Sequence, residues 1–193
     1  MNSSDSSPTH LPREIDEVSS EANFTGAPLS LLICLGAPRS GLNLLTKCLN
    51  LLGFNTPQHQ PGAETINRLL FQDLGLSPFM AGSLPRGWLQ TDAANRAKER
   101  IHSLLSSLKN FSTLTITPPT LPLWLESCQE HNIKPKFIHI IRHPWEVAQS
   151  LVANENIELS KAHIVWLANT RAALRALEHQ PSKTGLQRTV IGK

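Results

Sequence analysis

A short segment between Gly36 and Gly41 has the composition of an anion-binding loop. It reads Gly-Ala-Pro-Arg-Ser-Gly, with glycines five positions apart. Glycine lets the backbone come close to a ligand, so that consecutive N–H groups can point at the oxygens of a phosphate or sulfate. Arg39 lies inside the loop, and its planar guanidinium could hold the same oxyanion. For this loop alone, anion binding and a plain turn with an exposed arginine are equally good interpretations.

A second basic residue with a suitable setting is Arg142. Pro144 follows it at a position that suits the first turn of a helix, and Ser150 lies about two helical turns further on. The guanidinium and the hydroxyl could therefore bind a second anion beside the first. Taken alone, an arginine at the end of a strand is more often an ion-pair partner than an anion ligand.

The residues after the loop argue against magnesium chemistry. A nucleotide-hydrolysing phosphate loop carries Lys and then Ser or Thr directly after its last glycine, and the hydroxyl holds Mg²⁺. Leu42 and Asn43 stand at those positions here. The eight histidines form no pair with the spacing of a zinc site. We therefore expect no metal in the site, and a magnesium-dependent kinase is disfavoured.

Secondary structure must hold the residues of the two candidate anion sites in position. The hydrophobic pattern predicts strands alternating with helices. Leu29 to Leu35 is apolar except for Ser30, a pattern typical of a strand buried on both faces. Further strands are expected over 111–117, over 136–141 and near Thr189. Helices are expected over 42–52, 63–74, 91–108, 121–131 and 160–179, and a further helix is expected to begin at Pro144.

This alternation predicts an α/β fold: a doubly wound parallel sheet in a three-layer arrangement, with a strand–loop–helix of the P-loop type. Ligands of such sheets bind at the carboxyl ends of the strands. Arg39 and Arg142 both follow predicted strands, so the pattern places them at that edge.

The composition of the chain indicates one domain preceded by a tail. The 193 residues are 40% hydrophobic, which is enough for one domain with a core. Residues 1–28 hold five acidic side chains, one basic one and many serines, and predict a disordered tail. Residues 29–193 form the predicted domain, whose excess of basic residues suits an anionic ligand.

Several partner classes are disfavoured. The Lys and Arg residues are dispersed and not interleaved with aromatics, so no nucleic acid is expected. The longest apolar run, Leu31 to Leu35, is far shorter than the roughly 20 residues of a membrane span. Cys34, Cys48 and Cys128 have no metal-ligand spacing and are interpreted as buried free thiols in a reducing compartment. The start of the chain lacks a secretory signal, and a cytoplasmic protein is expected.

Together, the two basic segments resemble the bacterial-type sulfotransferase family. That family uses 3′-phosphoadenosine 5′-phosphosulfate and carries a Gly-x-Pro-Arg-Ser-Gly-Thr-Ser loop and an Arg-x-Pro helix with a Ser eight residues after the Arg. The chain matches at Gly36, Pro38, Arg39, Ser40, Gly41, Arg142, Pro144 and Ser150. The resemblance spans about residues 30–180 and includes similar stretches at 84–89, 121–125 and 159–176.

The resemblance implies transfer of a sulfuryl group to a hydroxyl or amine, without a metal. Arg39 would be the catalytic residue that stabilises the leaving phosphate. Gly36 and Pro38 belong to the loop that cradles the 5′-phosphosulfate, which Ser40 and the amides of Gly41, Leu42 and Asn43 would hold. Arg142 and Ser150 would hold the 3′-phosphate.

Three departures from the family pattern bear on activity. Leu42 and Asn43 replace the Thr-Ser pair that ends the family loop, Ile116 to Pro119 replaces a Lys-Asp-Pro-Arg motif, and the chain stops at Lys193, before the family's C-terminal segment. A truncated or degenerate relative is therefore expected. The alternatives are a non-catalytic nucleotide-binding relative and, less favoured, a P-loop kinase-like enzyme.

The acceptor side of the reaction is the least determined part. His59, Glu64 and His143 are candidates for the general base, and none is singled out. The acceptor, a small molecule or a glycan, is expected to bind among residues 55–90. The sequence predicts no oligomeric state.

Overall fold

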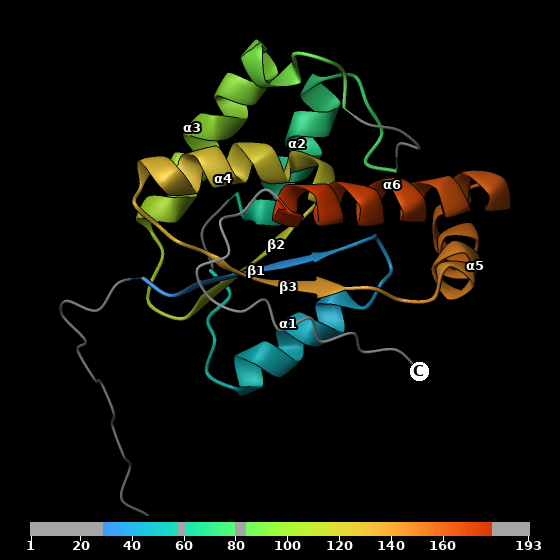
Figure 1. Cartoon of the computed structure of the whole chain (residues 1–193), viewed down its shortest axis with the longest axis horizontal. Coiled ribbons are helices and arrows are strands. Elements are labelled where there is room, and N and C mark those ends of the chain that lie inside the picture. The colour runs from blue at the N-terminus through green and yellow to red at the C-terminus, as the bar shows by residue number, and fades with distance from the viewer. Residues whose placement is uncertain (1–28, 58–60, 80–83, 179–193) are drawn as a thin grey trace, which may run out of the picture.

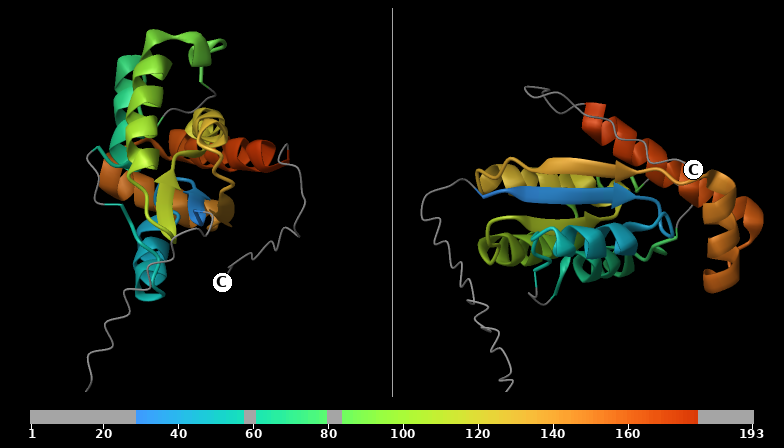
Figure 2. Two further views of the ribbon diagram at one scale, coloured as in Figure 1. Left: turned by 90° about the vertical axis from the view of Figure 1, so that its left-hand side faces the viewer. Right: turned by 90° about the horizontal axis from the view of Figure 1, so that it is seen from below.

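Three parallel strands form the centre of the protein. The structure is a computed structural model that describes residues 29–57, 61–79 and 84–178. Strands β1 (Leu31–Gly36), β2 (Ser112–Ile116) and β3 (Lys136–Ile140) lie in the order β2-β1-β3. Their arrows point the same way, towards the end of the sheet where α5 lies (Figures 1 and 2). The predicted mixed α/β fold with a parallel sheet is thus confirmed.

Strand β1 is buried along its whole length, as its apolar run predicts. It pairs with β2 through Leu31 to Leu35 and with β3 through Leu32 to Gly36. All of its residues are buried. A central strand of this kind has backbone partners on both edges and helices over both faces, so apolar side chains suit consecutive positions.

Helices cover both faces of the sheet. On one face, Leu49 of α1 (Leu42–Leu51) packs with Leu32 and Cys34. On the other face, Leu31 and Ile33 join a larger core with α2 (Ala63–Asp73), α3 (Asp92–Ser106) and α4 (Leu121–Glu130). The result is a three-layer arrangement (Figure 2). The doubly wound topology stays a prediction, because the described sheet has only one strand on each side of β1.

The ends of the helices agree closely with the expected ones. Thr91 caps α3 by accepting a hydrogen bond from the Ala94 N–H at 3.3 Å. Pro118–Thr120 forms a short 3₁₀ turn, η2, that ends β2 and leads into α4. A second such turn, η1 (Trp88–Gln90), comes directly before the Thr91 cap of α3. The strand expected near Thr189 and the tail of residues 1–28 lie outside the described residues.

Two further helices form a layer that supports the carboxyl end of β1. Helix α5 (Pro144–Glu155) packs against α6 (Leu159–Glu178) through a small core that includes Val147 and Val165. Ala37, which directly follows β1, is buried in the same core. The segment after β1 is therefore anchored to α5 and α6 and not only to the sheet.

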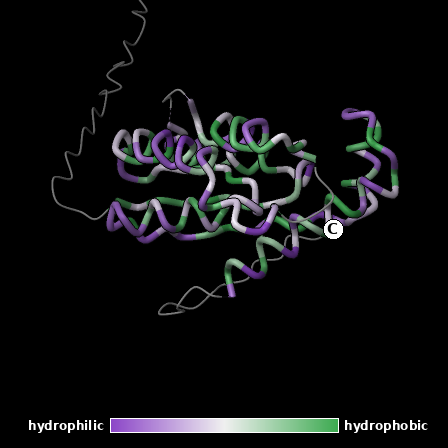
Figure 3. Tube along the Cα trace, turned by 90° about the horizontal axis from the view of Figure 1, so that it is seen from above, coloured by the Kyte–Doolittle hydropathy of each residue, from purple (hydrophilic) through white to green (hydrophobic). Residues whose placement is uncertain are grey.

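The hydropathy pattern fits this layering. Along the helices, hydrophobic and hydrophilic residues alternate with the turns, as expected for helices that bury one side (Figure 3). None of the helices within the described ranges is long and apolar enough to cross a membrane.

The cysteines are all free, but one expectation about them is wrong. Cys34 and Cys128 are buried as predicted, whereas Cys48 is exposed on α1. Burial raises the pKa of the Cys34 thiol to about 11 and that of Cys128 to about 12, because the apolar surroundings disfavour a thiolate. Cys48 follows the helical spacing of Leu45 and Leu49, but α1 contacts the sheet along a narrower stripe than that spacing implies.

Candidate anion-binding site

The loop between β1 and α1 folds tightly against β3, and Gly36 makes this possible. A Cβ atom at Gly36 would lie 2.5 Å from Ser40 Oγ and 3.2 Å from the Ile140 carbonyl oxygen. Both distances are shorter than ordinary van der Waals contact. The absence of a side chain therefore brings the loop and the end of β3 together.

The loop ends at an uncapped helix N-terminus. Gly41 is the N-cap of α1, with φ at 103°, and no side chain in the described part of the chain caps the helix. The first N–H groups of a helix have no intrahelical acceptor, so those of Leu42 and Asn43 need a partner from outside. The helix dipole adds positive potential at the same place. Such an end is suited to an anion.

Arg39 is held in an unfavourable backbone conformation. Its φ is 67°, in the left-handed region that costs a side-chain-bearing residue about 1–2 kcal/mol. From this position its Nε donates a hydrogen bond to Ser150 Oγ at 3.0 Å, across 111 residues of sequence. The loop is thus connected to the second turn of α5.

Arg142 lies in the same cluster. Its Nη1 donates to the Arg39 carbonyl oxygen at 3.3 Å, and its Nε donates to Glu146 Oε2 at 2.7 Å. Trp166 of α6 donates from its indole Nε1 to the Arg142 carbonyl oxygen at 3.0 Å. The pair with Glu146 is largely exposed, where such pairs contribute about 0–1 kcal/mol. Glu146 is therefore a counter-ion that a more strongly charged anion could displace.

Ser40 has a different orientation from the one its predicted role requires. Its hydroxyl is buried close to Gly36 and has no hydrogen-bond partner among the residues that the structure describes. A buried hydroxyl without a partner costs about 1–3 kcal/mol. To bind a ligand on the open side of the loop, the side chain would have to rotate.

The structure thus brings most of the predicted site residues together. Arg39, Arg142 and Ser150 form one connected group, next to the N–H groups of Gly41 to Asn43. We define this set as the arginine cluster. Pro38 is half-buried and shapes the loop. Arg39, predicted for the first anion site, is thus hydrogen-bonded to Arg142 and Ser150, predicted for the second.

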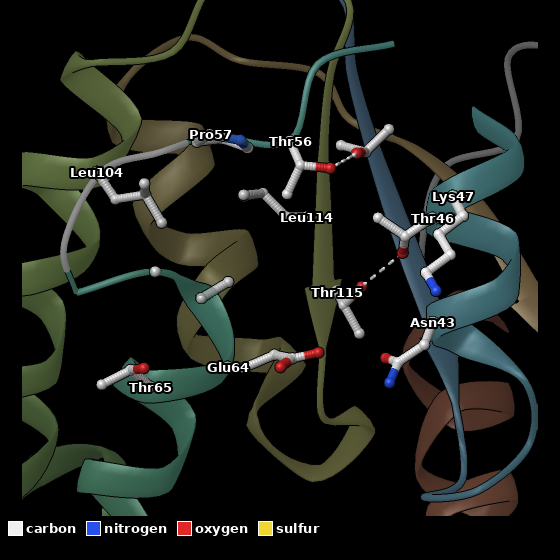
Figure 4. A pocket seen from close by; sticks show the side chains of 13 residues that line it. Asn43, Thr46, Lys47, Thr56, Pro57, Glu64, Thr65, Leu104, Leu114 and Thr115 are labelled. Atoms are coloured by element: carbon white, nitrogen blue, oxygen red, sulfur yellow. Dashed lines mark hydrogen bonds between the residues drawn. The ribbon is translucent and has the colours of Figure 1, made fainter. Parts of the chain in front are cut away.

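A cleft of about 430 Å³ lies on the β2 side of α1 (Figure 4). It is lined by α1, the segment before α2, the start of α2, and β2, together with one residue of α3. The lining residues are Asn43, Thr46, Lys47, Thr56, Pro57, Gly62, Ala63, Glu64, Thr65, Leu104, Thr113, Leu114 and Thr115. Asn43 belongs both to the first turn of α1 and to this cleft, so the cleft begins where the loop ends.

The structure describes two of the three candidates for the general base, and these two lie in different places. Glu64 lines the cleft, and its carboxylate points from α2 towards Asn43 (Figure 4). His143 is exposed at the N-cap of α5, on the β3 side. His59 lies outside the described residues.

Some residues of the site were not found in the sequence. The spacing of Arg142 and Glu146 is an i, i+4 signal that could have identified the ion pair. No local pattern points to Trp166, or to Lys47 and Thr115, because each contacts the site through tertiary packing.

Comparisons with known proteins do not assign a family. No family model matches the chain, and no curated protein matches it. Among solved structures, a similar one is the crystal structure of a "putative kinase" from Chloroflexus aurantiacus. The two chains are 15% identical with a TM-score of 0.43, over 75% of this chain and 80% of the other. Values this low carry no argument about function, which must be inferred from the site itself.

Proposed function

We propose that the chain binds 3′-phosphoadenosine 5′-phosphosulfate at the arginine cluster and transfers its sulfuryl group to a hydroxyl or amine acceptor. The observation that carries the proposal is that hydrogen bonds join Arg39, Arg142 and Ser150 in one group, and that Arg39 lies two residues before the uncapped N-terminus of α1. These residues come from two separate segments, and both segments resemble the sulfotransferase pattern.

The residues present fit a ligand with two anionic ends. The N–H groups at the start of α1 suit a 5′-phosphosulfate. Arg142 and Ser150, on the β3 side of the loop, suit a second phosphate. The unpartnered Ser40 hydroxyl is a further group that a bound oxyanion could satisfy.

The nucleotide would supply the sulfuryl group, activated by its anhydride bond to phosphate. The chain supplies position and electrostatics. The Arg39 guanidinium and the amides of Gly41 to Asn43 provide positive potential where negative charge would develop on the 5′-phosphate. Arg142 would bind the far end of the nucleotide, which would compete with Glu146 for the Arg142 guanidinium.

The acceptor would occupy the adjoining cleft. Asn43 lies between the loop and the cleft, which places an acceptor there within reach of the 5′ end. Of the two described base candidates, Glu64 lines this cleft, and its carboxylate could accept the acceptor's proton.

Nucleotide binding without turnover is a second candidate function. It is favoured by the end of β2, where the family motif has charged residues. Here Thr117 leads into the 3₁₀ turn of Pro118–Thr120, whose Pro118 and Thr120 are buried. The Thr120 hydroxyl donates to the Asn67 side chain in the core at 2.9 Å. No charged side chain comes from this turn.

A thermal-shift titration of the full chain tests the proposal. The probe is 3′-phosphoadenosine 5′-phosphate, with ATP and Mg²⁺ as the matched control. At about a hundred times Kd, binding adds ~2.7 kcal/mol to the free energy of unfolding, a rise in Tm of roughly 5–11 °C. A cooperatively melting chain that does not respond to the 3′-phosphorylated nucleotide, or responds equally to ATP with Mg²⁺, would contradict it.

Turnover is measured separately. The chain is incubated with nucleotide carrying a radiolabelled sulfuryl group and a panel of hydroxyl and amine acceptors. Transfer of label supports the enzyme. Binding without transfer to any acceptor supports the second candidate.

A further inference from the structure

The walls of the cleft beside α1 present different hydrogen-bonding groups. Glu64 reaches in from α2, while Asn43 and Lys47 reach in from α1, with Thr115 of β2 between them (Figure 4). Thr113 of β2 also lines the cleft. Which ligand fits depends on which of these groups can donate hydrogen bonds and which can accept them.

The Thr115 hydroxyl is only weakly engaged by its neighbour Thr46. Thr46 Oγ1 donates to the Leu42 carbonyl oxygen at 3.0 Å, so its single proton is used. Thr46 Oγ1 also lies 3.4 Å from Thr115 Oγ1, which is longer than an ordinary O–H···O hydrogen bond. The Thr115 hydroxyl can therefore both accept a hydrogen bond from a ligand and donate one.

Thr113 is less accessible than Thr115. Thr56 Oγ1 donates to Asn50 Oδ1 at 2.9 Å and lies 3.4 Å from Thr113 Oγ1. Thr113 is buried, whereas Thr115 is partly exposed, so Thr115 is the β2 hydroxyl that a ligand can reach. Its oxygen and the Glu64 carboxylate provide acceptors to the cleft.

The α1 wall supplies more donors. Lys47 carries three N–H donors and no acceptor, and the Asn43 amide carries two N–H donors and a carbonyl acceptor. Both side chains are exposed to the cleft (Figure 4). The positive charge of Lys47 and the negative charge of Glu64 balance each other. A ligand between the walls must both donate and accept hydrogen bonds, without a net charge.

We propose that the cleft binds a neutral polyhydroxylated ligand of the saccharide type, which is the acceptor if the proposed function holds. Each hydroxyl of a saccharide both donates and accepts, so one ring can satisfy both walls. None of the described lining residues is aromatic. A flat aromatic alcohol would bury these polar groups without partners, at a cost in affinity.

The test is a titration of the ¹⁵N-labelled full chain followed by amide chemical shifts. The saccharide probe is cellobiose, and the comparison probe is benzyl alcohol, each with and without 3′-phosphoadenosine 5′-phosphate. We expect cellobiose to shift the amides of Asn43 and of Thr113 to Thr115. Benzyl alcohol should leave these amides unmoved.

Variants assign the effect to the two walls. Lys47→Gln and Thr115→Val should each weaken cellobiose binding about three- to tenfold, the range for one lost hydrogen bond. Thr115→Ser keeps the hydroxyl and should bind as the parent chain does. Lys161→Gln removes a matched charge from α6, far from the cleft in sequence, and should have no effect. Thermal melts show that each variant is folded.

The outcomes separate the two proposals. Cleft shifts with cellobiose that weaken in Lys47→Gln and Thr115→Val support the inference. No cleft shift up to the solubility limit of cellobiose, or stronger shifts with benzyl alcohol, would overturn it. If the nucleotide leaves the amides of Gly41, Arg142 and Ser150 unmoved while cellobiose still shifts the cleft, the proposed function fails and the ligand class stands.

Discussion

The two sides of strand β1 differ in chemistry. On the β3 side, the arginine cluster and Glu146 form an exposed network of charged groups. On the β2 side, the cleft has hydroxyl groups and one balanced pair of charges, Lys47 and Glu64. The N-terminus of α1 lies between the two regions and contributes Asn43 to the second.

Under the two proposals, this difference corresponds to a division of work between two ligands. Guanidinium groups and a helix N-terminus favour a compact, highly charged anion, whose affinity depends on salt. Hydroxyl groups and a balanced pair of charges favour a neutral ligand, whose affinity depends less on salt. A transfer reaction needs two such sites side by side, and Asn43 belongs to both regions.

The largest expected effect is on the β3 side. Arg142→Ala and Arg39→Ala should each weaken binding of 3′-phosphoadenosine 5′-phosphate by about 1.5–3 kcal/mol, the range for a lost charge-assisted hydrogen bond. Calorimetric titration measures it. Arg171→Ala, an exposed arginine of α6, is the control for charge, and Thr115→Val is the control from the β2 side. Equal losses of nucleotide affinity in all four variants would contradict the proposed difference between the two sides of β1.

The next effect concerns the loop that both sides share. Gly41→Ala should lower the free energy of unfolding by about 1–2 kcal/mol, because a φ of 103° is unfavourable for alanine. A Cβ there would meet no atom within 4 Å, so the cost is in the backbone. Gly75→Ala, with φ at 68° and equally open space, should cost stability but leave nucleotide binding unchanged. Chemical denaturation measures the stability of the two glycine variants, and calorimetric titration measures their nucleotide binding.

Substitutions of Arg39 should change the stability of the protein and its affinity for the nucleotide separately. Arg39→Gly should be more stable than Arg39→Ala by about 1 kcal/mol, because glycine tolerates the left-handed conformation. Both variants should lose nucleotide affinity to the same extent. The midpoints of denaturant unfolding measure the difference in stability between the two variants. A glycine variant no more stable than the alanine variant would show that the backbone at this position is not strained.

The smallest effect tests whether Glu146 competes with the ligand. Glu146→Gln frees Arg142 and removes a negative charge, so nucleotide binding should tighten by about 0.3–1 kcal/mol. The gain should shrink as salt is added. Glu99→Gln, an exposed carboxylate of α3, is the control. Weaker binding in Glu146→Gln would mean that the ion pair positions Arg142 for the ligand instead of competing with it.

Much of the fold could be predicted because its signals are local. The apolar run of β1, the Thr91 cap of α3 and the proline at the start of α5 act within a few residues of where they stand. The mixed α/β class with a parallel sheet followed from their alternation. The exposure of Cys48 was predicted wrongly, since helical spacing does not give the width of the buried stripe.

For the candidate site, the sequence by itself determined the residue types: a glycine-bounded loop with an arginine, and an arginine followed by a serine two turns later. Only the tertiary structure decided that Arg39 bonds Ser150, that Glu146 pairs with Arg142, that the Ser40 hydroxyl turns inward, and that Glu64 lies across the cleft from Asn43. The physical reason is that a sequence motif specifies local backbone and side-chain chemistry. The order β2-β1-β3 and the packing of α5 and α6 depend on contacts between segments about a hundred residues apart, and those contacts set which groups meet.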